Sequence, residues 1–310
     1  MTKKFRIIIA GIGGVGGYFG GKLAKAFEGA EDVEIIFYAR GENLNSIRAN
    51  GLTIKTDEGT LVAHPALVTD NAAEAGIADL IICCVKSYHL EEAMLQLRPC
   101  IDANTAVLPL LNGVDAPERL RQLLPGTETW TGCVYIVAKL SAPGTIEQKG
   151  TVNSLHFGAE YGTKEKLDRA LDIFKQAGIH AFLHENIETV VWQKFVFISA
   201  IASLTSYLNT SIGTILSTPA HKELLLSLLN EVTAVAKAKQ IPLPAGIIES
   251  TVEKMATLPP ATTSSMQLDF SLGKQTEAAT LTMYVLKLAK TLQIATPAYE
   301  TVAKRLMAHA

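Results

Sequence analysis

The residues best suited to chemistry near the start of the chain form a glycine loop that could hold phosphate groups. They fit the pattern G-x-G-x-x-G and comprise Gly11, Ile12, Gly13, Gly14, Val15 and Gly16. The pattern alone is a weak signal, but here it follows the apolar run Phe5–Ala10 and opens a helix-compatible segment, Gly14–Phe27. In that setting glycines permit a tight turn and a close approach of the backbone to a pyrophosphate, and the helix N-terminus favours anions. The loop therefore predicts a dinucleotide site, with a purely structural turn as the alternative.

The residue after the second apolar run indicates which dinucleotide would fit. NAD-binding proteins usually place Asp or Glu at the end of this strand, where the carboxylate bonds the ribose 2′-hydroxyl. Here the run Val33–Tyr38 leads instead through Ala39 to Arg40. A guanidinium can pair with a 2′-phosphate through two parallel hydrogen bonds. Arg40 therefore predicts NADP(H) in preference to NAD(H), unless it is a solvated surface arginine.

Two further polar residues follow strands of buried character. Lys86 comes after the apolar run Leu80–Val85, and Asn112 comes after the run Thr105–Leu110. Ligands of parallel α/β sheets bind beyond the carboxyl ends of the strands. We expect Lys86 to neutralise a cofactor phosphate or a substrate carboxylate, and Asn112 to bond the cofactor or the substrate. The alternative is that each residue merely begins a loop.

A proton donor is the next requirement, because a ketone reduced by hydride carries an oxygen that must be protonated. Lys194 lies in the apolar segment VVWQKFVFISAIASL, with no other charge for many residues after it. Partial burial of an ammonium makes proton release easier, although lysines more commonly extend to solvent. We expect Glu277, on a later helix, to orient or charge-balance Lys194, and Ser265 to bond a substrate carboxylate.

The elements that must position these residues change in character along the chain. In the first half, near-continuous apolar runs alternate with helical patterns, which is typical of a parallel sheet covered on both faces. Residues Thr129–Val137 and Val152–Gly158 read as further strands around a turn at Pro143-Gly144. From about Asn186 the pattern is helical, and the predicted helices are Val190–Leu208, Pro219–Lys239, Pro244–Met255, Lys274–Leu292 and Pro297–Ala308.

The sequence therefore predicts an α/β protein in two domains. An N-terminal Rossmann-type, doubly wound sheet would span residues 1–185 and bind NADP(H), and an all-helical domain would span residues 186–310 and carry the substrate and catalytic groups. A net charge of −2, a pI near 6.4 and the lack of a basic tract argue against nucleic acid as a partner. The uncharged stretch Phe195–Ala220 is rich in hydroxyl side chains and fits a buried helix better than a membrane span. The four cysteines have no metal or disulfide spacing, as expected of free thiols in a reducing cytoplasm.

At this point the residues resemble the 2-dehydropantoate 2-reductase (ketopantoate reductase) family over nearly the whole length. The glycine loop and Arg40 are joined by short motifs, namely VKS at Lys86, NG at Asn112, W-x-K at Trp192–Lys194, T-S-S-M-x-x-D at Thr263–Asp269, T-E at Thr276-Glu277 and TP at Thr296-Pro297. The resemblance implies a Rossmann domain, a helical domain and an active site between them. It also implies NADPH-dependent reduction of 2-dehydropantoate to pantoate, on the route to pantothenate.

The family also implies roles for individual residues. Lys194 would be the proton donor, Ser265 would bind substrate, Glu277 would lie at the cofactor and substrate site, and Asn112 would touch both. The sequence departs from the family where Ile198 and Ala202 replace the asparagines usually found four and eight residues after the lysine, and a glycine often found after the T-E motif is also missing. Ser206 and Asn209 are candidates to compensate, although they are out of register.

Two alternatives follow from this departure. The first is an NADPH-dependent reductase of another 2-oxo acid, bulkier or less polar near Ile198, because lost amides remove a basis for recognising a polar substrate. The second is an NADP-binding regulatory protein without turnover, which would have no need for Lys194, Ser265 and Glu277 together. We expect a cytoplasmic protein without a membrane partner, and the long apolar helices could supply a homodimer interface.

Overall fold

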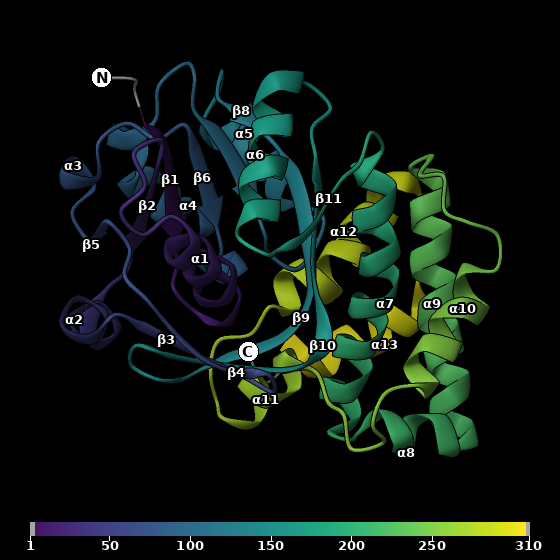
Figure 1. Ribbon diagram of the computed structural model, residues 1–310. Helices are drawn as coiled ribbons and strands as arrows, with labels where there is room; N and C mark the ends of the chain where they lie inside the picture. The colour runs from purple at the N-terminus through teal and green to yellow at the C-terminus, as the bar shows by residue number, and fades with distance from the viewer. Residues whose placement is uncertain (1–3, 308–310) are drawn as a thin grey trace. The chain divides into compact units, whose positions relative to one another are not determined.

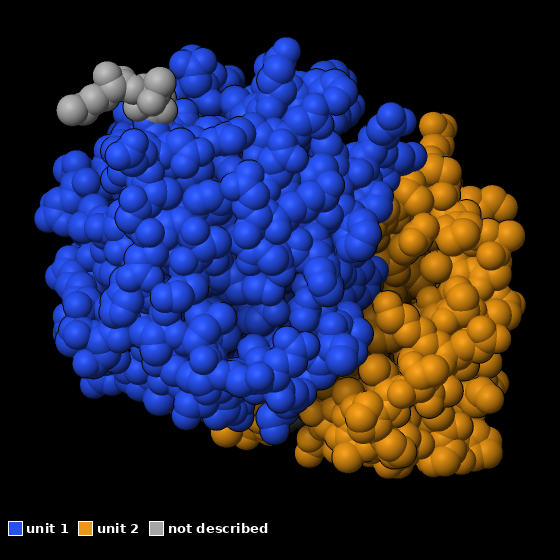
Figure 2. Space-filling view, in the orientation of Figure 1, with its two compact units in different colours: residues 1–111, 116–187 blue, residues 112–115, 188–310 orange. Residues whose placement is uncertain are grey.

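The computed structural model describes residues 4–307 and divides into two compact units (Figures 1 and 2). Unit 1 comprises residues 1–111 and 116–187, and unit 2 comprises residues 112–115 and 188–310. This division falls two residues after the one predicted from the sequence. The short segment Asn112–Asp115 belongs with the helical unit although it follows a strand of unit 1. Ala308, the last residue of the final predicted helix, lies outside the described residues.

Unit 1 is built on a six-stranded parallel sheet, as the alternation of apolar runs and helices predicted. Its spatial order is β5-β2-β1-β6-β7-β8, which is the strand order of dinucleotide-binding sheets. The strands are β1 (Phe5–Ala10), β2 (Val33–Tyr38), β5 (Leu67–Thr69), β6 (Leu80–Cys83), β7 (Ala106–Pro109) and β8 (Glu128–Thr129). The register pairs the last residues of the four central strands, so the segments that follow these strands leave the sheet along one edge.

Each face of this sheet has its own hydrophobic core, because alternate side chains of a strand point to opposite faces. On one face, Ile8 and Ile81 pack against three helices, α3 (Ala72–Ala75), α4 (Leu90–Gln96) and α5 (Ala116–Leu123). On the other face, Ile7, Ile9 and Phe37 pack against helix α1 (Gly14–Ala26). The sheet is therefore covered on both sides, which confirms the predicted class.

A second sheet lies beyond α1, and most of it was not predicted from the sequence. Its order is β11-β10-β3-β4, with β9 also paired to β10. Its strands are β3 (Leu52–Thr56), β4 (Gly59–Ala63), β9 (Thr131–Ala142), β10 (Thr145–Gly158) and β11 (His180–Leu183). Only the antiparallel pair β9 and β10, the long strands in Figure 1, was expected, and both strands are longer than predicted. Helix α6 (Lys164–Gln176), also not predicted, packs on this sheet.

Three glycines of α1 explain how closely the second sheet approaches the helix. A Cβ added to Gly14 would lie 2.2 Å from the carbonyl oxygen of Ala138, on β9. A Cβ on Gly17 would lie 2.5 Å from Ile146 of β10, and a Cβ on Gly21 would lie 2.3 Å from the Ile54 side chain of β3. Larger residues at these three positions would force the helix and the second sheet apart.

Unit 2 is helical, as predicted. Its helices are α7 (Ile187–Leu208), α8 (Ile212–Ser217), α9 (Pro219–Ala238), α10 (Ile247–Ala256), α11 (Ser265–Ser271), α12 (Tyr284–Leu292) and α13 (Pro297–Met307). The apolar helix α7 packs through Trp192, Phe195 and Leu204 into the core of this unit. Its buried Ser199 hydroxyl is satisfied, because it donates to the carbonyl of Leu281 at 2.9 Å and is hydrogen-bonded to the Tyr299 hydroxyl at 2.6 Å. Helix α7 is long and apolar enough to cross a membrane, yet 61% of its most apolar window is buried inside the unit.

Three predicted helix starts were wrong. Helix α7 begins at Ile187, three residues before the predicted start at Val190. Helix α10 begins at Ile247 and not at Pro244, because Gly246 takes a left-handed conformation at the start of the helix. The helix predicted from Lys274 begins only at Ala278, after a turn at Gly273, which has a φ of +63°. It opens with one π-helical turn, Ala279–Met283, before α12. Glu277 therefore lies just before the helix and not within it.

Candidate active site

The glycine loop has the geometry that its sequence predicted. Gly11 follows β1 with a φ of +90°, a conformation that side chains rarely adopt, and α1 begins at Gly14. A Cβ on Gly16 would lie 2.1 Å from the carbonyl oxygen of Gly11, so the loop can fold back on the helix only with glycine there. By contrast, a Cβ on Gly13 would meet no atom of the described residues within 4 Å. Open space in front of Gly13 is what a pyrophosphate approaching the backbone needs.

A cavity of about 220 Å³ lies beside this loop, within unit 1. Its lining comprises Gly11, Ile12, Gly13, Tyr38, Ala39, Arg40, Asn43, Val85, Ala93 and Gln96. Whole-ligand pockets have volumes of roughly 300–1,000 Å³, so this cavity accounts for part of a dinucleotide. The part it suits is the ribose nearest the end of β2, because Arg40 stands at that end as the N-cap residue of α2 (Gly41–Asn50).

The structure adds two residues that the sequence did not single out, Asn43 in the lining of this cavity and Glu92 beside Arg40. The Asn43 amide donates to the carbonyl of Ile12 at 2.8 Å, and its oxygen accepts from the backbone N–H of Gly144 at 2.8 Å. Asn43 thus ties the glycine loop to α2 and to the turn between β9 and β10. Glu92 of α4 accepts a hydrogen bond from the Arg40 guanidinium at 2.9 Å. Neither residue belongs to a motif, and the contacts join segments far apart in the sequence.

Lys86 is half-buried and comes directly before a short 3₁₀ helix, Ser87–His89, at the carboxyl end of β6. The segment that follows it is braced by Arg119 of α5. This guanidinium donates to both carboxylate oxygens of Glu91 and to the carbonyl of Ser87, each at 2.7 Å. The hydrogen bonds from Arg119 hold the pKa of Glu91 below its usual value. Lys86 therefore extends from a fixed backbone, as a phosphate or carboxylate contact requires.

Three of the predicted site residues are brought together in unit 2. The Lys194 ammonium donates to the Asn112 side-chain oxygen at 3.0 Å, and the Asn112 amide donates to the Glu277 carboxylate at 3.4 Å. Glu277 is only 4% exposed, whereas Lys194 and Asn112 are half-buried. Asn112 thus stands between the ammonium and the carboxylate. Asn112 therefore joins Glu277 to Lys194, the two residues expected to act together.

The backbone around Asn112 explains why a glycine follows it. Gly113 has a φ of +99°, and a Cβ there would lie 2.3 Å from the Thr280 side chain. This close approach packs the Asn112 loop against the π-helical turn Ala279–Met283. The carbonyl of Glu277 accepts from the backbone N–H groups of Thr280 and Leu281, which fixes the start of the same turn. π-helical turns occur frequently at functional sites.

The two serines of the T-S-S-M motif have different environments. Ser264 is buried at the N-cap of α11, where its hydroxyl accepts from the backbone N–H of Gln267 at 3.0 Å and is hydrogen-bonded to Thr205 at 2.8 Å. Ser265 is exposed at the first position of the helix. In the part of unit 2 that the structure describes, Ser265 is not joined to the chain formed by Lys194, Asn112 and Glu277. Its exposure leaves it available to a ligand.

The helix face beyond Lys194 is apolar. Ile198 is half-buried, and Ala202 is 1% exposed, within the core of unit 2. The polar residues considered as substitutes are placed elsewhere. Asn209 lies just beyond α7, with a φ of +49°, and its side chain bonds to Gln267 at 3.2 Å. The Ser206 hydroxyl is buried and has no hydrogen-bond partner within residues 4–307.

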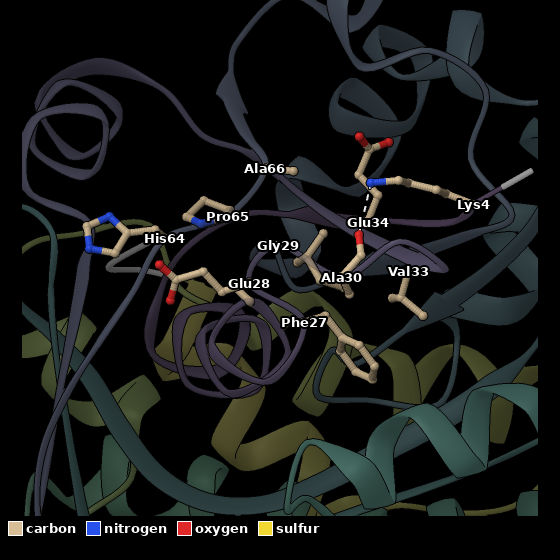
Figure 3. A pocket seen from close by; sticks show the side chains of 12 residues that line it. Lys4, Phe27, Glu28, Gly29, Ala30, Val33, Glu34, His64, Pro65 and Ala66 are labelled. Carbon is tan, nitrogen blue, oxygen red and sulfur yellow. Dashed lines mark hydrogen bonds between the residues drawn. The ribbon is translucent and has the colours of Figure 1, made fainter. Parts of the chain in front are cut away.

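A larger cavity, of about 330 Å³, lies at another place in unit 1 (Figure 3). It is formed by the end of α1 around Phe27 and the start of β2 around Val33, and Lys4 beside it donates to the carbonyl of Ala30 at 2.9 Å. This is the amino end of the strands, whereas ligands of such sheets bind beyond the carboxyl ends. The smaller cavity beside the glycine loop is therefore the better cofactor site.

Comparison with known proteins identifies the family of both parts of the chain. A family model described as "Ketopantoate reductase PanE/ApbA" matches residues 7–160, and one described as "Ketopantoate reductase PanE/ApbA C terminal" matches residues 186–310. The chain belongs to the ketopantoate reductase family. The predicted family and fold class are therefore confirmed, and members of this family are NAD(P)-dependent oxidoreductases acting on CH–OH groups.

Individual relatives show how far the likeness extends. A structure of 2-dehydropantoate 2-reductase from Porphyromonas gingivalis W83 is 35% identical, with a TM-score of 0.86 over 98% of this chain and 100% of that one. An uncharacterized oxidoreductase of Bacillus subtilis, YkpB, is 28% identical over 96% of both chains. A structure of D-mandelate dehydrogenase with NADH and anilino(oxo)acetate has a TM-score of 0.85 over 98% of each chain, but its 22% identity shows the fold alone. The family thus establishes a nicotinamide dinucleotide cofactor and leaves the substrate open.

Proposed function

We propose that this protein reduces 2-dehydropantoate to pantoate with NADPH, as a step toward pantothenate. The observation that carries the proposal is the hydrogen-bonded chain Lys194–Asn112–Glu277, in which a half-buried ammonium is aimed by an amide that is itself held by a buried carboxylate. A preorganised cation of this kind can both stabilise and protonate a developing oxyanion. We assign cofactor binding to unit 1 and catalysis to unit 2.

The proposed division of labour follows from the charges of the groups. Bound NADPH would supply hydride for the keto carbon and leave as NADP⁺. Lys194 donates its proton to the keto oxygen, which becomes the hydroxyl of pantoate, and the resulting amine regains a proton from solvent. Asn112 keeps the ammonium in place through its side-chain oxygen, while Ser265 binds the substrate carboxylate. Glu277 offsets the charge of the ammonium from the far side of Asn112.

We propose that Arg40 recognises the 2′-phosphate of NADPH and that Lys86 contributes a second positive charge to the cofactor. The support for Arg40 is its place at the end of β2, in the lining of the cavity beside the glycine loop. Arg40→Ala is expected to weaken NADPH binding by about ten- to hundredfold, because hydrogen bonds between charged groups contribute about 1.5–3 kcal/mol. The same variant should change NADH binding by less than twofold. Equal losses for the two coenzymes would count against 2′-phosphate recognition.

A second candidate substrate is favoured by the apolar side chains of Ile198 and Ala202. Without the two amides, the site has fewer groups to bond the terminal hydroxyl of 2-dehydropantoate, and another 2-oxo acid with an apolar side chain becomes the second candidate. The two substrates 2-dehydropantoate and 3,3-dimethyl-2-oxobutanoate differ only by that hydroxyl. A site that bonds a hydroxyl rejects the analogue without it by about 10⁴–10⁵-fold, whereas an apolar pocket discriminates by about 100-fold or less.

The test is therefore NADPH oxidation by the wild-type protein with this matched pair and a wider panel of 2-oxo acids. A ratio of kcat/KM above about 10³ in favour of 2-dehydropantoate supports the first candidate, since it exceeds what an apolar pocket achieves. A ratio near unity, or a preference for the analogue, supports the second. Tight NADPH binding with turnover of no 2-oxo acid contradicts both and leaves a regulatory NADP-binding protein.

We also place the protein in the cytoplasm. All four cysteines are free thiols, and three of them are buried, which suits a reducing compartment. Most of the apolar window of helix α7 is buried in the core of unit 2, as in a helix of a soluble protein. A homodimer formed through the helical unit stays a prediction, which size-exclusion chromatography with light scattering tests.

A further inference from the structure

The guanidinium proposed to read the 2′-phosphate already has an anionic partner in the protein. Arg40, which lines the cavity beside the glycine loop, donates to the Glu92 carboxylate at 2.9 Å. Both side chains are about half exposed, at 54% for Arg40 and 48% for Glu92. The pair therefore lies where a ligand from solvent can reach the arginine, and Glu92 occupies one of its donors.

Glu92 is held in this position by more than Arg40. The Gln96 amide, one turn along α4, donates to the same carboxylate at 3.3 Å, and the Tyr38 hydroxyl donates to the Gln96 oxygen at 3.2 Å. His89 contacts the other carboxylate oxygen at 3.3 Å. Tyr38 and Gln96 line the cavity, so the network connects its wall to the carboxylate. The hydrogen bond from Arg40 is the main cause that keeps the pKa of Glu92 below its usual value, so the group is anionic at neutral pH.

A carboxylate at this place repels a phosphate group electrostatically but does not repel a neutral hydroxyl. A phosphate monoester carries about −1.5 to −2 charges at neutral pH, and once it pairs with Arg40 it stands within a few ångströms of Glu92. Two unit charges about 5 Å apart in a water-like dielectric shift an equilibrium about fourfold per unit of charge, and less in salt. NADH has a hydroxyl at the same position and meets no such repulsion.

We propose that Glu92 is a specificity-determining residue that competes with the 2′-phosphate for Arg40 and so lowers the ratio of NADPH affinity to NADH affinity. The inference rests on the proposed recognition of the 2′-phosphate by Arg40. The coenzyme preference then results from two opposite charges on separate elements. Arg40, before α2, strengthens NADPH binding, and Glu92, on α4, weakens it.

The decisive variant is Glu92→Gln, which removes the charge but keeps an oxygen that can accept from Arg40. Binding of NADPH and NADH is measured by coenzyme fluorescence, without turnover, at low and at high salt. Glu92→Gln should bind NADPH about three- to tenfold more tightly at low salt, with a smaller gain at high salt, and should bind NADH within twofold of wild type. Glu118→Gln, a matched loss of one exposed charge on α5, should change neither.

The outcomes separate this inference from the proposal beneath it. If Glu92→Gln leaves the ratio of NADPH to NADH affinity unchanged or lowers it, Glu92 does not restrain phosphate binding and the inference is overturned. If Arg40→Ala weakens both coenzymes equally, recognition of the 2′-phosphate by Arg40 is itself overturned. A selective loss in Arg40→Ala with a selective gain in Glu92→Gln supports both.

Discussion

Replacing Gly13 by alanine should abolish most coenzyme affinity while leaving the fold intact. The added Cβ would meet no atom of the described residues within 4 Å, and Gly13 has a φ of −94°, which alanine adopts without strain. The methyl group instead occupies the space through which the pyrophosphate reaches the backbone. Loss of one charge-assisted hydrogen bond costs about 1.5–3 kcal/mol, so NADPH should bind about ten- to hundredfold more weakly.

Gly16 is the matched control in the same loop, with the opposite expected result. A Cβ there would lie 2.1 Å from the Gly11 carbonyl oxygen and 2.9 Å from the Cβ of Cys84, so α1 must move away from both the loop and the residue that follows β6. Overpacking of this kind costs about 1–3 kcal/mol or more. A loss of about 3 kcal/mol lowers the melting temperature of a unit of this size by about 6–12 °C.

Fluorescence titration of NADPH and thermal unfolding of both variants check this pair of expectations. Gly13→Ala should unfold within about 4 °C of wild type, since a compatible Gly→Ala change alters stability by less than about 1 kcal/mol. Wild-type NADPH affinity in a folded Gly13→Ala protein would refute the placement of the pyrophosphate. A Gly16→Ala protein of unchanged stability would refute the packing argument for the loop.

Three further expectations concern other residues. Asn112→Ala removes the group between Lys194 and Glu277, and we expect kcat/KM with the best 2-oxo acid to fall about ten- to hundredfold, with a smaller loss of NADPH affinity; unchanged kcat/KM would contradict the role of the chain. Burial raises the pKa of the Cys83 thiol to about 12, so thiolate-selective alkylation at about pH 8, followed by peptide mass spectrometry, should label Cys83 only after unfolding. Burial also lowers the pKa of His184, so as the pH falls below 6.5 the unfolded chain takes up a proton before the folded protein does, and the free energy of unfolding decreases. The urea midpoint should therefore fall between about pH 7.5 and 5.5, and it should fall less in His184→Asn.

The glycine loop and its supporting strands could be predicted because their signals are local. The run Phe5–Ala10 is apolar at every position except Arg6, and β1 has these bounds. The glycines at 11, 13 and 16 follow it directly. A parallel sheet with helices was also readable, because each strand and each following helix carries its own pattern within a few residues.

The second sheet could not be predicted because its strands are defined by distant partners. Strands β3 and β4 are short and only partly apolar. Strand β3 pairs with a distant segment, for example Thr53 with Thr145. The glycines of α1 at positions 17 and 21 were a signal of a close neighbour on that side of the helix, but they do not say which segment it is. Propensity decides little where such tertiary pairing dominates.

The candidate site was predicted in its members but not in its contacts. Lys194, Asn112 and Glu277 were each chosen from local context, and the structure joins them in one chain through Asn112. The start of the helix near Glu277 was misplaced because the chain stays non-helical from the turn at Gly273 through Glu277, which apolar periodicity does not reveal. Glu92 and Asn43 were missed because a surface glutamate and a helix asparagine have no distinguishing pattern until the fold brings them to Arg40 and Ile12.

The central claim is that Lys194 protonates a 2-oxo acid during its reduction by NADPH. The most direct measurement is kcat for Lys194→Ala at saturating NADPH and 2-oxo acid, beside the affinity of the same variant for NADPH. Loss of a positioned general acid should lower kcat by about 10²–10⁴-fold, with NADPH affinity within twofold of wild type. A Lys194→Ala enzyme that keeps full activity would contradict the account.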